Sequence, residues 1–289
     1  MRLEIVNNDG PRSSSWPPPI LEIRQTPDLR ALSARNGGFT LTEVAVVLII
    51  VGLLLGGVLG PLSAQNDLRA TNETKAALAE IREALFGYAA AKGRLPCPAN
   101  PELANNDVSA GVEGSYISTG CANLAGVLPW VTLGVGETDA WGNRFSYVVS
   151  TKFTRPPPLA AFASGECTGT PPPSLPTSAG FALCTVGDLS IANTAGGVGV
   201  ASGLTVVVVS HGKNGGGAFL TSGKQIPISS DNDEIENLLI KDSATGKWKN
   251  AGFDKVFIKK APTVSFDDEL TWISTPLLLS RMMSAGKLP

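Results

Sequence analysis

An acidic stretch, SSDNDEIEN (residues 229–237), carries the side chains best suited to binding a metal ion. Asp231, Asp233 and Glu234 lie close together in sequence, and their carboxylates are the hard oxygen ligands that Ca²⁺ takes. The spacing is not that of an EF-hand loop. A solvated acidic turn that caps the helix-like segment EIENLLI explains the same residues, because acidic side chains stabilise a helix N-terminus. Both interpretations stay open.

The chain has a single histidine, His211, which follows Ser210 and leads into a glycine loop. A Ser-His-Asp hydrolase would need this histidine as its base, but no G-x-S-x-G nucleophile elbow accompanies it. The glycines of GGVGVASG (196–203) have the wrong spacing for a dinucleotide fingerprint, and TSGKQ (221–225) lacks the Ser or Thr of a phosphate loop. We read both as turns and predict no catalytic residue.

Glu43 lies where a charge is costly. It precedes the run VAVVLIIVGLLLGGVLGPL, and no charged residue occurs from Val44 to Asn66. About 20 consecutive apolar residues span a bilayer as a helix, so we predict a transmembrane segment at about residues 42–64. A carboxylate inside the membrane costs about 2.5–3.5 kcal/mol unless it is paired. Either a cation pairs with Glu43, or its side chain snorkels to the cytoplasmic surface.

A long helix and a strand-rich domain would position these residues. We predict one helix over residues 39–92, apolar all round in its first half and amphipathic in its second, ended by Gly93 and Pro96. The apolar positions of the second half recur at helical spacing: Leu78, Ile81, Leu85 and Tyr88.

Beyond residue 93 the pattern changes to short strands and turns. The stretch DAWGNRFSYVVS (139–150) has a Gly-Asn turn followed by alternating apolar residues, LTVVVVSHGKNGGG (204–217) reads as a buried strand, and FDKVFIKK (253–260) alternates. We expect a small antiparallel sheet packed on the second half of the helix, an α+β fold. Residues 155–178 read as an irregular proline-rich surface loop, and TPLLLSRMM (275–283) as a short helix.

The cysteines indicate an oxidising compartment. Four are present, all after the predicted span: Cys97, Cys121, Cys167 and Cys184. An even number on one side fits two disulfides. Three pairings are open, of which the sequential one closes the shorter loops, and four reduced core thiols are the alternative. The formal net charge of −2 gives no basic footprint for nucleic acid.

The stretch GGFTLTEVAVVLIIVGLLL (37–55), with the helix that follows it, resembles the start of type IV pilins and type II secretion pseudopilins. The resemblance implies that a prepilin peptidase removes residues 1–38 as a leader, longer than is usual, by cutting between Gly38 and Phe39. The enzyme would then methylate the new amine of Phe39. In a helical array of subunits, that amine and a neighbour's Glu43 would neutralise each other and set the axial stagger.

The segment DAWGNRF (139–145) also looks like a turn of the major pseudopilins. In those proteins a comparable strand, glycine loop and acidic turn hold a calcium ion. The resemblance therefore implies Ca²⁺ as a candidate cofactor at Asp231, Asp233 and Glu234, although Lys213 and Asn214 interrupt the glycine loop here.

The resemblance implies a structural subunit and no enzyme. Residues 93–289 would form a periplasmic domain on a single-pass inner-membrane anchor, which later enters a type IV pilus or type II secretion pseudopilus. The implied partners are other pilin or pseudopilin subunits, the prepilin peptidase, and an inner-membrane assembly platform with its cytoplasmic ATPase. The chain length and the proline-rich loop favour a minor component. An adhesive or DNA-binding tip module is the alternative, and a tethered periplasmic enzyme using His211 is the least favoured.

Overall fold

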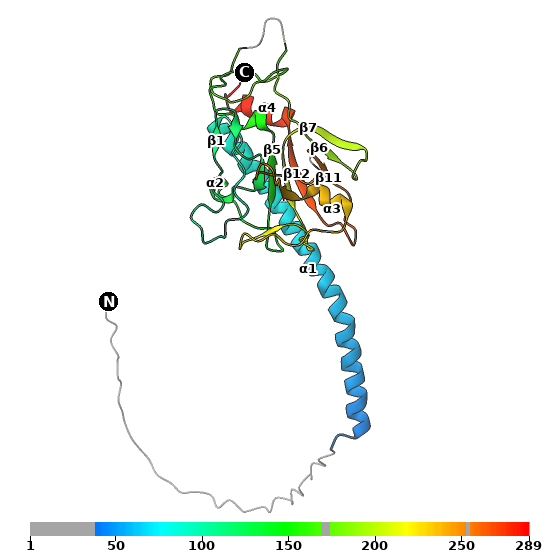
Figure 1. Ribbon diagram of the computed structural model, residues 1–289. Helices are drawn as coiled ribbons and strands as arrows, with labels where there is room; N and C mark the ends of the chain where they lie inside the picture. Colours follow the sequence, from blue (N-terminus) through cyan, green and yellow to red (C-terminus); the bar gives the residue numbers. More distant parts are fainter. Residues whose placement is uncertain (1–37, 169–173, 253–254, 289) are drawn as a thin grey trace, which may run out of the picture. The chain divides into compact units, whose positions relative to one another are not determined.

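A computed structural model describes residues 38–168, 174–252 and 255–288, except for the side chains of residues 57–63. The chain divides into two compact units, Met1–Gly56 and Gly57–Pro289 (Figure 1). Apart from Gly38, the leader predicted at residues 1–38 lies outside the described part.

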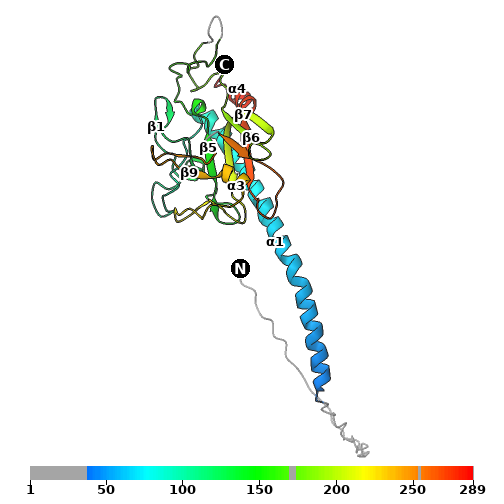
Figure 2. The ribbon, with the colours of Figure 1, turned by 45° about the vertical axis from the view of Figure 1, so that its right-hand side comes forward.

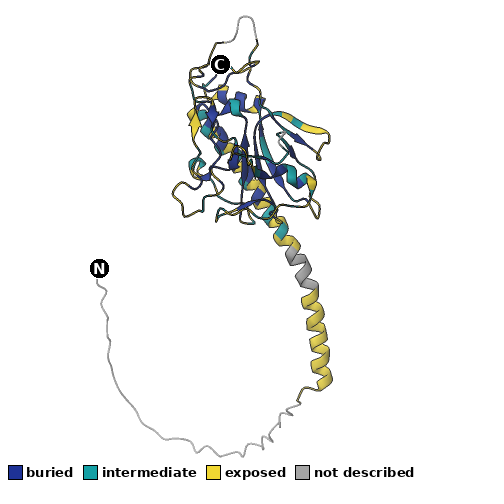
Figure 3. Cartoon of the chain, viewed as in Figure 1, coloured by how far each residue is buried: buried dark blue, intermediate teal, exposed yellow. Residues whose placement is uncertain are grey.

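In the described part of the first unit, helix α1 (Leu41–Lys92) begins after Thr40. Every side chain described between Phe39 and Val51 is exposed, and so are Leu53, Leu54 and Leu55 (Figure 3). Among the residues that the structure describes, no helical segment combines the length and the hydropathy of a membrane span. Residues 57–63 of the segment expected at 42–64 lie outside the described side chains.

In the second unit, the later turns of α1 pack against a sheet (Figures 1 and 2). Leu78, Ile81 and Leu85 are buried as their spacing predicts, whereas Tyr88 is half-buried. Gly93 ends the helix with a φ of +71° and a hydrogen bond from its N–H to the Ala89 carbonyl. A Cβ at Gly93 would lie 2.3 Å from a backbone carbonyl oxygen, so only glycine fits there.

The six-stranded sheet is built around β7 (Gly199–Ser210). Along one edge of β7, the first half of the strand pairs with β6 (Leu189–Ala192) and the second half pairs with β5 (Ser146–Val149). The other edge pairs with β12 (Glu269–Ser274). Beyond β5 lies β3 (Ala125–Val127).

The sheet is mixed, which corrects the expectation of an antiparallel sheet. The last strand, β11 (Val256–Ile258), pairs with β6 in parallel, and the other pairs are antiparallel. Parallel strands need a long crossover connection, which the intervening strands and a helix supply here. Residues 253–254, the start of the strand expected at 253–260, lie outside the described part.

The remaining elements are short. They are β1 (Tyr116–Ile117), β2 (Gly120–Cys121), α2 (Trp130–Leu133), β4 (Asn143–Arg144), η1 (Thr151–Phe153), β8 (Phe219–Leu220), α3 (Asn232–Asn237), β9 (Leu239–Lys241), β10 (Trp248–Asn250) and α4 (Thr275–Ser284). The predicted C-terminal helix is confirmed as α4, with Pro276 in its first turn.

Both faces of the sheet are covered, which explains the unbroken apolar run of β7. Val206 and Val208 face the core formed with α1 and α4, whereas Val207 and Val209 face a second core on the other side. Strands buried on both faces read as continuous hydrophobic runs. The segment 196–203, which we expected to be turns only, joins this strand from Gly199 onward.

Two disulfides join the cysteines in sequential order, Cys97 to Cys121 and Cys167 to Cys184, so the alternative of reduced thiols is wrong. The second disulfide clamps the proline-rich loop. Beside it, the buried Arg155 guanidinium donates two hydrogen bonds to the Glu166 carboxylate, at 2.8 and 2.9 Å. The base of the loop is therefore fixed by a covalent bond and by a buried ion pair.

Candidate functional site

Three carboxylates meet beside the C-terminal end of β7. Glu234 comes from α3, and Asp267 and Asp268 come from the segment that leads into β12. One oxygen of each carboxylate lies within 4.8 Å of the others. Glu234 and Asp268 are each only 1 % exposed. This arrangement concentrates negative charge where water has little access.

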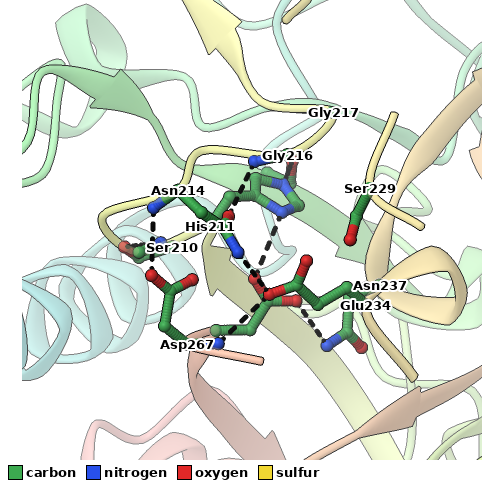
Figure 4. A network of polar contacts seen from close by, with 12 residues as sticks. Ser210, His211, Asn214, Gly216, Gly217, Ser229, Glu234, Asn237 and Asp267 are labelled. Atoms are coloured by element: carbon green, nitrogen blue, oxygen red, sulfur yellow. Dashed lines mark hydrogen bonds and ion pairs between the residues drawn. The ribbon is translucent and has the colours of Figure 1, made fainter. Parts of the chain in front are cut away.

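The glycine loop after β7 orients two of these carboxylates (Figure 4). The Asn214 side-chain amide donates to Oε1 of Glu234 at 2.7 Å, and the Asp267 N–H donates to the same oxygen at 3.1 Å. The N–H groups of Lys213 and Asn214 donate to Oδ2 of Asp267 at 2.9 and 3.0 Å. A bend through Gly212, with a φ of +60°, brings these donors to the acids.

Asp268 is held from the other side. The Asn237 side-chain amide donates to its Oδ2 at 2.7 Å and also to the Ile258 carbonyl, while the Ile258 N–H donates back to Asn237. The end of α3 is thereby tied to β11 and to the acidic segment.

The second oxygens of Glu234 and Asp267 have no such partners. Oε2 of Glu234 and Oδ1 of Asp267 are buried and accept no hydrogen bond from any described residue. Burial raises the pKa of the Asp267 carboxyl, and the charges of Glu234 and Asp268 raise it further. A divalent cation bound between the carboxylates would supply the missing interactions, and an all-carboxylate set suits Ca²⁺. The residues therefore fit the ion that the resemblance implies.

His211 lies beside this cluster and is fully buried. Its Nε2 lies 2.8 Å from the Ser146 hydroxyl oxygen, and its Nδ1 lies 3.7 Å from Oδ1 of Asp268. A serine, a histidine and an aspartate thus lie side by side, as in a hydrolytic triad, but the buried Nδ1 of His211 makes no hydrogen bond with any described residue. Because Ser146 is only 1 % exposed, no substrate reaches its hydroxyl in this structure. The contacts join β5 to the loop after β7 and to the segment that leads into β12.

The structure places Asp231 and Asp233 differently from Glu234. Asp231 caps α3 by accepting from the N–H of Asp233 at 2.8 Å and also accepts from the Ser265 hydroxyl. Asp233 binds Lys260 and accepts from the Ala195 N–H at 2.7 Å. Both carboxylates are thus occupied by protein donors.

Sequence reasoning missed Asp267 and Asp268. The visible signal was two consecutive acids in SFDDEL (265–270), before a strand that had not been predicted. The β12–β7 register pairs Glu269 with Ser210, which brings the preceding Asp268 beside His211. The pairing of β12 with β7 therefore brings the residues of the acidic cluster together.

The DAWGN motif (139–143) forms a turn that is hydrogen-bonded to the C-terminal end of β7. Oδ1 of Asp139 accepts from the N–H groups of Trp141 and Asn143 at 3.0 and 2.9 Å, and the Ser210 hydroxyl donates to its Oδ2 at 2.6 Å. The Ala140 N–H donates to the Thr74 hydroxyl on α1 at 3.3 Å. This turn ties the long helix to the end of β7.

A second candidate site lies at the start of α1. Phe39 is 85 % exposed, and Gly38 before it is also exposed. Thr40 and Glu43 form a capping box, in which the Thr40 N–H donates to Oε2 of Glu43 at 3.0 Å and the Glu43 N–H donates to the Thr40 hydroxyl at 3.2 Å. Sequence reasoning had not assigned Glu43 this local role.

Residues 33–59 match the family model described as the prokaryotic N-terminal methylation motif, which is the prepilin cleavage signal of type IV pilins and pseudopilins. No curated protein and no solved structure matches the chain. The matched segment includes Gly38, Phe39 and Glu43.

Proposed function

We propose that this protein is a structural subunit of a type IV pilus or type II secretion pseudopilus. The observation that carries the proposal is the N-terminal methylation motif at residues 33–59. A prepilin peptidase would cut between Gly38 and Phe39, and the mature chain would assemble with other pilin or pseudopilin subunits through α1. An inner-membrane platform with a cytoplasmic ATPase would drive this assembly.

The segment at residues 42–64 would anchor the subunit in the inner membrane before assembly. The uniformly exposed apolar side chains described from Leu41 to Leu55 support this, because such a surface is unfavourable in water. The two disulfides support a periplasmic location for the C-terminal domain. The chain length and the proline-rich loop favour a minor subunit.

Glu43 would contribute to registry between subunits. In the precursor its Oε2 is bound to Thr40, while its Oε1 has no partner among the described residues. Cleavage creates a cationic amine at Phe39, and a neighbour's amine could bind the open oxygen without breaking the capping box. The pair would offset the cost of placing a carboxylate in the membrane.

Mass spectrometry of the mature N-terminus tests the proposal. The native chain should begin at a methylated Phe39, whereas Gly38→Val, which places a branched side chain beside the scissile bond, should leave the precursor uncut. Gly52→Ala is the matched control, since a Cβ there meets nothing within 4 Å. Glu43→Ala should be processed normally but should be lost from fibres. A Phe39-started chain from the Gly38→Val variant would overturn the cleavage assignment.

We also propose that Ca²⁺ binds Glu234, Asp267 and Asp268. The buried oxygens without partners on Glu234 and Asp267 support this assignment. The ion would have a structural role, joining the glycine loop, α3 and the start of β12. Asp231 and Asp233, the other residues that the sequence indicates, would hold the start of α3 in place through Ser265 and Lys260.

A further inference from the structure

Strand β12 lies at an edge of the sheet, and its hydrogen-bonding pattern can be assigned residue by residue. The Ser150 N–H donates to the Thr205 carbonyl at 2.8 Å, so β7 turns the backbone groups of its odd-numbered residues towards β5. Its even-numbered residues, among them Val206 and Val208, therefore turn towards β12, where Ile273 and Thr271 are opposite them.

The alternate residues of β12, Leu270 and Trp272, consequently direct their N–H and C=O groups away from β7. No backbone partner of these groups occurs in the part of the chain that the structure describes. Unprotected edges of this kind are templates for pairing with another strand, and proteins commonly block them with proline or lysine. The β12 sequence ELTWIS contains neither.

A groove of about 350 Å³ runs along this edge. It is lined by Arg82, Leu270, Thr271, Trp272, Ser274 and Leu277. The two residues with outward backbone groups thus line the groove, next to an exposed leucine of α4. The edge offers hydrogen bonds and apolar surface at the same place.

Arg82 gives the groove a positive charge. It is half-buried on α1, and its Nε is buried without a hydrogen-bond partner among the described residues. Two other cations of the same helix form ion pairs: Arg69 with Glu73, and Lys75 with Glu269. A carboxylate supplied from outside would satisfy the Arg82 guanidinium.

We propose that β12 and Arg82 form a docking site for an extended acidic segment of another protein, which adds a strand to the sheet. Its backbone bonds to Leu270 and Trp272, its carboxylate pairs with Arg82, and an apolar side chain contacts Leu277. A second copy of this chain fits less well, because the acid that its β12 would bring, Glu269, is already bound to Lys75 and Lys259.

Amide hydrogen exchange of the full-length, isotope-labelled protein in detergent tests the proposal. The probe is a blocked peptide, acetyl-Thr-Val-Glu-Val-Thr-Val-amide. In the free protein, the amides of Leu270 and Trp272 should exchange at least tenfold faster than those of Thr271 and Ile273. The peptide should slow exchange at Leu270 and Trp272 by at least tenfold and leave the other two unchanged.

Peptide and protein variants separate the backbone contribution from that of the charge. A peptide with alternate N-methylated amides should not bind, since it cannot donate along one edge. Replacing its glutamate by glutamine should weaken binding about fivefold, as expected for the loss of a charge-assisted hydrogen bond. Arg82→Gln should remove this preference for glutamate, whereas Arg69→Gln, the control at an exposed and paired arginine, should keep it.

Three results would overturn the proposal. The first is exchange at Leu270 and Trp272 that the peptide does not slow. The second is equal binding of the glutamate and glutamine peptides to the unaltered protein. The third is protection of these two amides that rises with protein concentration in the absence of peptide, which would identify a second copy as the occupant. The peptide comparisons use the unaltered protein, so they decide the question even if Arg82→Gln fails to fold.

Discussion

The carboxylate cluster leads to a prediction in which one substitution has opposite effects with and without calcium. Glu234→Gln keeps an oxygen that can accept from Asn214 and from the Asp267 N–H, so both hydrogen bonds survive. It removes one of three adjacent negative charges. Without calcium the variant should therefore be at least as stable as the native protein. Calcium should then stabilise the variant much less than it stabilises the native protein.

The size of the effect follows from linkage. A ligand at one hundred times its Kd stabilises the folded state by about 2.7 kcal/mol. For a domain of this size, about 1 kcal/mol moves the melting temperature by about 2–4 °C. Chelation of calcium should therefore lower the Tm of the native protein by about 5–11 °C. The Glu234→Gln variant, with one ligand charge fewer, should show less than half of this shift.

Differential scanning fluorimetry with EGTA measures the Tm without calcium, and the same measurement with excess calcium gives the calcium-dependent shift. Asp233→Asn is the matched control on the same helix, because its carboxylate binds Lys260 outside the cluster. This variant should lose stability equally in the two conditions and keep the full calcium shift. A native Tm that does not respond to calcium would refute the reasoning. If the Asp233→Asn variant alone lost the calcium-dependent shift in Tm, the calcium ligands would instead be among the acids predicted from sequence, Asp231, Asp233 and Glu234.

Glu166→Gln should destabilise the fold by about 3–5 kcal/mol in chemical denaturation, because it leaves the charge of the buried Arg155 guanidinium without a neutralising carboxylate. Burial alone would raise the pKa of Glu166, but hydrogen bonds from Arg155 and Thr185 outweigh it and lower this pKa below 4.5. The stabilisation is therefore complete above about pH 4.5 and lost as pH falls through the folded pKa, and melts of Glu166→Gln should lack this acid-dependent loss. Joint replacement of Cys97 and Cys121 by alanine removes the disulfide between two residues 24 positions apart. It should lower the free energy of unfolding, measured by chemical denaturation, by about 3.5 kcal/mol. An unchanged denaturation midpoint would contradict this prediction.

Sequence patterns were sufficient to predict the elements that depend on interactions between residues close together in the chain. The spacing of Leu78, Ile81 and Leu85 identified the buried face of α1, and Gly93 marked its end. Proline at the start of TPLLLSRMM identified α4 in the same way. The disulfide pairing agreed with the sequential arrangement because short loops need little chain closure entropy.

The acidic cluster could not be predicted in full, because it depends on strand register. Glu234 was visible from its neighbours, but Asp268 approaches His211 only through the pairing of β12 with β7. No pattern within either strand determines that pairing. The parallel contact of β11 with β6 was missed for the same reason, since it joins segments separated by several other strands.

The packing of α1 against α4 has a consequence for the order in which the chain is made. Arg281 of α4 lies 5.2 Å from the ring centroid of Phe86, and Lys287 donates to the Ala91 carbonyl across 196 positions of sequence. Met282 belongs to the same buried cluster as Leu78. A ribosome therefore makes nearly the whole polypeptide before the burial of the apolar face of α1 can be completed. Products that end before α4 would leave part of that face uncovered and would be prone to aggregate.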